Sequence, residues 1–199
     1  MNRRIAMAAS LVNLTAVVCF ALSMLLGFDF GSYFSSMFIA FSFVPMACAF
    51  AHFAGEKAKL AGLTAVGFSA VYAAIILLVY FAQLTTVRMD ALTEQASALL
   101  DFQQFGLLFS YDLLGYGVMA LSTFFAGLTI EAAAPADRWL KGLLLVHGVF
   151  FVSCLLLPML GAFKPGGEVW IGVAALTIWC LYFAPVGALS CLHFSKCRD

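Results

Sequence analysis

FGLLFSYDLLGYGVMALSTFFAGLTI, residues 105–130, is the stretch that decides how this chain folds. It is long enough to cross a bilayer as a helix, because about 20 apolar residues rising about 1.5 Å each span the hydrocarbon core. It also contains Asp112, the only formally charged residue well inside any apolar run of the chain. The rest of the sequence can be placed relative to this helix.

The overall composition excludes an ordinary soluble domain. Of the 199 residues, 64% are hydrophobic and only 10% are charged, whereas soluble domains are about 45–50% apolar and about 25% charged. Lipid must therefore solvate most of the apolar surface. The net charge of +0 and the absence of a basic cluster indicate no nucleic-acid partner. The six cysteines show no CxxC spacing and do not predict a disulfide framework.

Five more apolar runs accompany the first and predict an all-α, polytopic integral membrane protein. The chain is expected to form one transmembrane bundle over residues 1–199, with crossings at 5–28, 33–54, 60–85, 105–130, 139–163 and 169–194. The first run exceeds the apolar core of about 7–15 residues in a signal peptide, so it is interpreted as a retained helix. The composition of residues 164–168, KPGGE, is typical of a turn.

Residues 88–104 form the one long polar segment. Apolar residues recur there at helical spacing and acidic residues mostly occupy the other face, which predicts an external amphipathic helix before the fourth crossing. Interfacial helices that bind anionic lipid are rich in Lys and Arg, and this one is acidic. Two arrangements therefore stay open: a helix packed over the mouth of the bundle, or a stem that runs straight into the fourth crossing.

The placement of Lys and Arg predicts the orientation of the bundle. With six crossings, two of the ten basic residues fall on one side, Arg88 and Lys164, and the others fall on the opposite side: Arg3, Arg4, Lys57, Lys59, Arg138, Lys141, Lys196 and Arg198. Both termini are therefore expected in the cytoplasm, in a bacterial inner (plasma) membrane. Six crossings divide into halves of opposite topology, as in some transporters, although the two halves show no convincing sequence match.

Asp112 is the main candidate for function. A carboxylate inside a bilayer is costly, by roughly 2.5–3.5 kcal/mol at a helix centre on insertion scales, so it should face the bundle interior or a cavity. Tyr116 lies one turn further along the same face, and Tyr80, Ser23 and Thr177 are predicted at a similar depth. Asp112 is either a proton-coupling or cation-binding carboxylate, or an outer-leaflet residue that reaches the headgroups or caps a structural network.

Three other residues inside the predicted crossings attract attention. His147 and Asn13 are predicted at nearly the same depth, so a hydrogen bond between them would form a structural polar network. Trp179 lies deep in the sixth crossing and is the aromatic residue best placed for a ligand pocket.

The sequence predicts no metal site and no cofactor. His52, Cys191, His193 and Cys197 are chemically suitable zinc ligands, but their spacing matches no standard zinc motif. The chain also lacks a phosphate-binding loop, a Rossmann fingerprint, HExxH and GxSxG.

These observations support three hypotheses of function. The first is a bundle that binds or transports a small molecule, with or without proton coupling, through an outward-facing cavity lined by Asp112, Tyr116, Tyr80, Trp179 and Thr177. The second is a sensor or accessory subunit without chemistry of its own, with tight packing around Asp112 and a membrane partner or a second copy of itself. The third is a membrane-embedded enzyme that acts on a lipid or quinone with His147 as base; an enzyme is the less favoured class, because only Asn13 accompanies that histidine.

Overall fold

The computed structural model describes residues 1–89, 91–163 and 169–197. Its long helices are α1 (Asn2–Leu25), α2 (Asp29–His52), α3 (Lys59–Leu84), α5 (Leu107–Leu128), α6 (Pro135–His147), α7 (Phe150–Met159) and α8 (Val169–Lys196). The short elements are η1 (Glu56–Ala58), η2 (Val87–Met89), α4 (Glu94–Leu100) and η3 (Phe102–Gln104). The described residues contain no strand, which confirms the predicted all-α class. The predicted turn at 164–168 lies outside the described residues.

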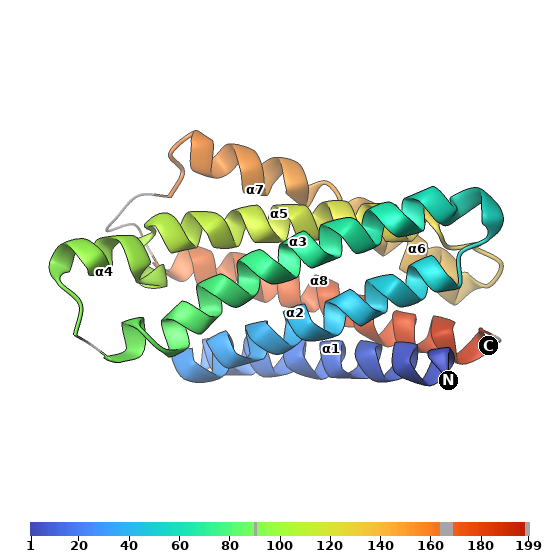
Figure 1. The fold of residues 1–199 in the computed structure, drawn as a ribbon, viewed down its shortest axis with the longest axis horizontal. Coiled ribbons are helices and arrows are strands. Elements are labelled where there is room, and N and C mark those ends of the chain that lie inside the picture. The colour runs from blue at the N-terminus through green and yellow to red at the C-terminus, as the bar shows by residue number, and fades with distance from the viewer. Residues whose placement is uncertain (90, 164–168, 198–199) are drawn as a thin grey trace.

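Six segments are long and apolar enough to span a membrane, as the sequence predicted. The fifth of them, Pro135–Met159, consists of α6 and α7 together. The N- and C-termini lie at one end of the bundle and α4 lies at the other (Figure 1). We call these the terminal end and the α4 end. Which end faces the cytoplasm stays a prediction from the Lys and Arg distribution.

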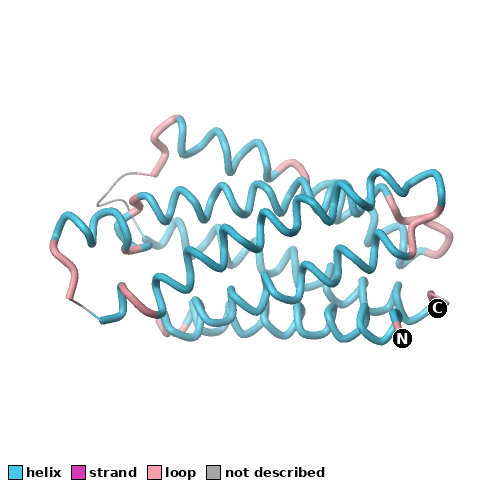
Figure 2. The backbone as a smooth tube through the Cα atoms, in the orientation of Figure 1, coloured by secondary structure: helices cyan, strands magenta, loops and turns pink. Residues whose placement is uncertain are grey.

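The helices form a ring in chain order. α1 packs on α2, α2 on α3 and α3 on α5, while α8 packs on the far side of α1. α5 then packs on both α6 and α7, and α6 closes the ring against α8. Figure 2 shows that most loops lie at the two ends, so the walls of the ring are almost entirely helical.

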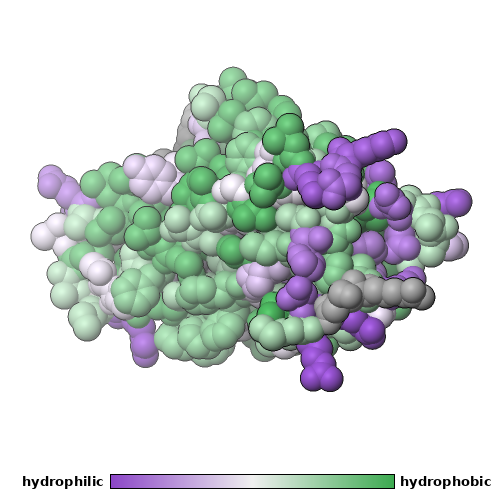
Figure 3. Space-filling view, turned by 45° about the vertical axis from the view of Figure 1, so that its right-hand side comes forward, coloured by the Kyte–Doolittle hydropathy of each residue, from purple (hydrophilic) through white to green (hydrophobic). Residues whose placement is uncertain are grey.

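The outer surface of the ring is apolar, which fits a lipid environment. Large hydrophobic side chains such as Leu63, Leu78 and Leu181 are between 67% and 74% exposed. Hydrophilic residues gather at the terminal end, with a broad hydrophobic band beside them (Figure 3). Because water would leave this much apolar area unfavourably solvated, the exposed band is best explained by contact with acyl chains.

The fifth span is broken, unlike the continuous helix expected over residues 139–163. At Gly148 and Val149 the backbone N–H groups bond to carbonyls three residues earlier, at 3.1 and 3.0 Å, which tightens the chain into a turn. A side chain at Gly148 would come within 2.9 Å of Phe124 Cβ on α5, so only glycine lets the chain approach so closely there. The turn lies partway along the bundle (Figure 2).

This turn changes what the second half of the span contacts. α6 packs on both α5 and α8, whereas α7 packs on α5 alone among its major contacts. No residue of α7 is fully buried, and α7 stands apart from α8 in Figure 1. The ring is therefore closed at the terminal end and loosely joined between α7 and α8 toward the α4 end.

The polar segment at 88–104 is a short helix over the mouth of the bundle. Only α4 is α-helical, flanked by η2 and η3, so the continuous helix expected over this range does not form in its described residues. Phe105 adopts a left-handed φ of 54°, and a side chain at Gly106 would collide with the Ala98 carbonyl on α4. The segment therefore folds back over α5, and the alternative of a straight stem is wrong.

The contact between α2 and α3 depends on Gly62. An added Cβ there would lie 2.8 Å from Ala51 Cα, a backbone atom that cannot move aside. We expect Gly62→Ala to lower the free energy of unfolding in mixed detergent–SDS micelles by about 1–3 kcal/mol. Gly67→Ala is the matched control, because it lies on the same helix with nothing within 4 Å of its added Cβ. Equal stabilities of the two variants would contradict this packing.

Candidate functional site

Asp112 lies in the first third of α5 and faces the inside of the ring. Its side chain is only 2% exposed, as expected for a carboxyl group that avoids lipid. The helix can bring it close to α3 because Gly115, on the next turn, packs directly against Ile76: an added Cβ would lie 2.8 Å from the Ile76 side chain. A glycine thus allows the close approach that buries the acid.

Buried hydroxyl groups from three helices surround this carboxyl group. The Tyr80 hydroxyl on α3 lies close to Asp112, to Tyr116 on α5 and to Ser36 on α2. Tyr72 packs its ring on Tyr116 at a centroid separation of 5.9 Å. The structure therefore brings together Asp112, Tyr116 and Tyr80 as the sequence suggested, and adds two residues that sequence reasoning missed.

Most of these polar groups have no hydrogen-bond partner among the described residues. Four buried atoms of the cluster make no hydrogen bond to any described residue: Ser36 Oγ, Tyr72 OH, Asp112 Oδ1 and Tyr116 OH. A buried polar atom without a partner costs about 1–3 kcal/mol, and more when it is charged. Such a concentration of unpartnered atoms is expected where a site receives something from outside the chain.

Asp112 and Tyr116 line a cavity of about 240 Å³. His147 and Trp179 line the same cavity, so α5, α6 and α8 all contribute polar or amphipathic side chains to it. The remainder of the lining is mostly apolar and aromatic, with Phe109 and Phe150 among it. Two groups that the sequence placed at different depths, Asp112 and His147, thus face one space.

The cavity reaches the surface between α7 and α8. Leu157 on α7 and Ala175 on α8 both line it, and both are exposed. These are the two helices that make little contact with each other. The cavity therefore opens sideways, toward the region that acyl chains occupy around a membrane protein.

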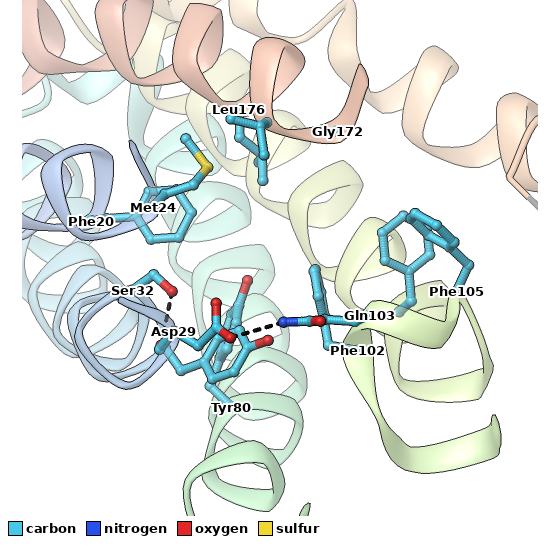
Figure 4. A pocket seen from close by; sticks show the side chains of 13 residues that line it. Phe20, Met24, Asp29, Ser32, Tyr80, Phe102, Gln103, Phe105, Gly172 and Leu176 are labelled. Carbon is cyan, nitrogen blue, oxygen red and sulfur yellow. Dashed lines mark hydrogen bonds between the residues drawn. The ribbon is translucent and has the colours of Figure 1, made fainter. Parts of the chain in front are cut away.

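A second hollow lies at the α4 end, beside the first. It has a volume of about 160 Å³ and contains Asp29, Tyr80 and Gln103 on one side and Leu176 on the other (Figure 4). The Gln103 amide donates a hydrogen bond of 2.8 Å to Asp29 Oδ2 across it. Four residues line both spaces and separate them: Phe102, Phe109, Gly172 and Leu176.

The polar segment at 88–104 covers this hollow and is held in place by Gln83 at the end of α3. The Gln83 amide donates to the Leu100 carbonyl at 2.7 Å and accepts from the Phe102 N–H at 3.0 Å. These two bonds place the Phe102 ring against Tyr80 and Phe109, with centroids 6.0 and 5.1 Å apart. The polar segment therefore supplies part of the wall of both spaces.

His147 is fully paired within the bundle. Its Nε2 accepts a hydrogen bond of 3.0 Å from the Trp179 indole N–H, and its Nδ1 lies 2.8 Å from the Thr123 hydroxyl. Because an indole can only donate, Nδ1 must carry the proton and donate to Thr123. Thr123 then donates to the Ala120 carbonyl at 2.9 Å. The histidine is a neutral link between α5, α6 and α8.

The expected pair of Asn13 with His147 is wrong. Asn13 donates instead to the Ile39 carbonyl at 3.2 Å and to the Ser42 hydroxyl at 3.0 Å, both on α2. The physical reason is the order of the ring, in which α8 lies between α1 and α6. Equal depth did not mean adjacency.

Thr177 does not join the candidate site. Its hydroxyl donates to the Val173 carbonyl of its own helix at 2.7 Å, and it is absent from the described lining of the Asp112 cavity. The predicted depth was not enough, because Thr177 lies on a different face of α8 from Leu176 and Trp179, which do line the cavity.

The two histidines at the terminal end have other partners. His193 Nδ1 lies 2.9 Å from Asp137 Oδ1, which joins α8 to α6, and His52 Nε2 lies 3.0 Å from the Asn2 amide. Within the described residues no group of three His, Cys, Asp or Glu side chains could hold a metal ion. This end of the bundle is fastened by pairwise contacts.

Comparisons with protein-family models, curated proteins and solved structures give no match for this chain. The geometry of the cavity and the chemistry of its lining are therefore the basis for a function.

The His147 link should contribute measurably to stability. Thr123→Val removes the hydroxyl but keeps the shape, so the Nδ1–H loses its acceptor. We expect a loss of about 0.6–1.7 kcal/mol, from the average to the largest value found for hydrogen bonds between membrane helices. The measurement is reversible unfolding in mixed micelles. Thr64→Val is the control, because the Thr64 hydroxyl is exposed and bonds only to Leu60 of its own helix. If both variants were as stable as the parent, the link would carry no energy.

Proposed function

We propose that this protein binds a small molecule in the Asp112 cavity and moves it across the membrane, with the charge state of Asp112 coupled to binding. One observation carries the proposal: a buried carboxyl group with an unpartnered oxygen forms part of the wall of a cavity that opens to the surface. Intramembrane acids are costly and are typically found on substrate or proton pathways. Pockets of this kind, apolar with a few polar groups, are the usual form of small-molecule sites.

The proposed orientation places the cavity in the outer half of the membrane. The two basic residues predicted outside, Arg88 and Lys164, belong to the α4 end by sequence, and the remaining basic residues belong to the terminal end. Asp112 lies near the start of α5 at the α4 end. The cavity would then load from the outer leaflet or the outer solution.

The contacts of His147 argue against the enzyme hypothesis. A general base needs a free lone pair within reach of the proton that it removes. The lone pair on Nε2 already accepts from Trp179, and Nδ1 carries the proton donated to Thr123. Use of His147 as a base would require breaking the link between α5, α6 and α8.

The accessory-subunit hypothesis has less support. It requires close packing around Asp112, whereas this residue lines a cavity of about 240 Å³, and four polar atoms of the cluster, its own Oδ1 among them, lack partners in the described chain. A purely structural buried acid would be expected to have its hydrogen bonds completed by the protein.

The accessibility of the cavity can be tested with Cys154, which lines it. In a variant that keeps Cys154 as its only cysteine, we expect methyl methanethiosulfonate to modify the thiol in reconstituted vesicles, as followed by mass spectrometry. The matched control keeps only Cys180, which is 3% exposed and outside the described cavity lining. Cys180 should react far more slowly. Equal protection of the two thiols would show that the cavity is not accessible, and it would contradict the proposed function.

The role of Asp112 can be tested with any compound that protects Cys154 from this reagent. In proteoliposomes that contain a pH-sensitive dye, such a compound should drive proton movement through the parent protein. Asp112→Asn keeps the shape but cannot release a proton, so we expect loss of the proton signal while Cys154 stays accessible. Undiminished proton movement in this variant would show that Asp112 is not the coupling group.

A further inference from the structure

We propose that the molecule taken up by the Asp112 cavity is a small lipophilic amine, bound as its ammonium ion. The inference rests on the proposed function and narrows it to a chemical class. It follows from the charge, the aromatic lining, the size and the opening of the cavity, which are considered in turn.

The charge of the cavity calls for a cation. Asp112 is the only formally charged residue in the described lining, which contains neither Lys nor Arg. The His147 imidazole also lines the cavity, but both of its nitrogens are already hydrogen-bonded, to Trp179 and to Thr123. An ionised carboxylate in such surroundings is stable only when paired, because the surroundings solvate charge poorly. A ligand that carries a positive charge supplies the counter-charge that the described lining lacks.

The polar atoms near Asp112 can accept from an ammonium group. An ammonium ion of a primary amine carries three N–H donors and no acceptor. Asp112 Oδ1 and the Tyr116 hydroxyl are both without a partner among the described residues, and both residues line the cavity. The donors of the ligand therefore match unpartnered acceptors of the wall, which a neutral hydrocarbon would leave unsatisfied.

The aromatic lining favours the same class. Trp179 and Tyr116 meet edge to face with ring centroids 5.2 Å apart, next to the carboxyl group. Phe109 and Phe150 also line the cavity. Cations within about 6 Å of aromatic ring faces are attracted to them, and the attraction grows when water is excluded. The rings also accommodate the apolar part of the molecule.

Size and opening limit the ligand further. A volume of about 240 Å³ exceeds the roughly 150 Å³ of an engineered apolar cavity that accommodates benzene, so a molecule with one small ring or a short chain fits. The exposed rim residues Leu157 and Ala175 are apolar. A lipophilic amine dissolved in the bilayer would meet this rim directly.

The experiment uses the full chain with Trp139 and Trp170 replaced by phenylalanine, which leaves Trp179 as the only tryptophan. In detergent at neutral pH we expect 2-phenylethylamine to change the Trp179 fluorescence saturably, and more tightly than 2-phenylethanol, which has the same shape without the charge. Asp112→Asn should weaken amine binding by about tenfold to a hundredfold, as expected for loss of a charged hydrogen-bonded pair. It should leave the alcohol unaffected, and Asp112→Glu should restore part of the amine affinity.

Asp29→Asn is the matched control, since it removes the carboxylate of the neighbouring hollow but not that of the Asp112 cavity. It should leave amine affinity unchanged.

Equal binding of amine and alcohol, unaltered by Asp112→Asn, would overturn the amine class while leaving a small-molecule cavity intact. Failure of both probes to bind would also overturn it, and unreactive Cys154 in the same protein would then show that the proposed function fails as well. Loss of amine binding in Asp29→Asn alone would move the cation site to the α4-end hollow and refute the assignment.

Discussion

The solvation of one carboxyl group is the constraint on which the rest of this structure depends. Asp112 lies within a helix that is apolar enough to span a membrane, so its carboxyl group must lie beside polar groups inside the ring. Helix α3 supplies the neighbouring hydroxyl of Tyr80, and Ser36 on α2 and Tyr116 on α5 lie close to that hydroxyl. The Ser122 hydroxyl reinforces the α3–α5 contact by donating to the Ala65 carbonyl at 2.7 Å. These contacts make the hydroxyl-lined side of the ring its rigid side.

The opposite side of the ring is built differently. There the chain tightens at Gly148, and the second half of the fifth span leaves α8. The protein thus combines a firmly packed wall that holds the acid with a loosely packed wall that gives access to it. This division is what a binding site within a membrane requires, because a ligand must enter without disturbing the groups that recognise it.

The sequence predicted the class of fold, the six spans and the inward position of Asp112, because these follow from length, hydropathy and the cost of burying charge. It also grouped Tyr116 with Asp112, since residues four apart share a helix face. It failed where the answer depends on how helices are rotated and ordered around the ring. Ser36 and Tyr72 were missed for that reason, and Asn13 was matched to a histidine that lies beyond α8. The turn at Gly148 was missed because a glycine in an apolar run marks a close contact only when the neighbouring Phe124 is known.

The two polar residues that share the cavity show why burial alone does not identify a functional group. His147 is 1% exposed and Asp112 is 2% exposed, so exposure does not distinguish them. Their hydrogen bonds do: both nitrogens of His147 are paired within the bundle, whereas one oxygen of Asp112 and the nearby Tyr116 hydroxyl have no partner in the described chain. A satisfied group already gives its interaction energy to the fold. An unsatisfied one reduces stability until something binds to it, and the protein can offset that cost only through what it binds. This contrast, and not the depth of the residue in the membrane, assigns the structural part to His147 and the binding part to Asp112.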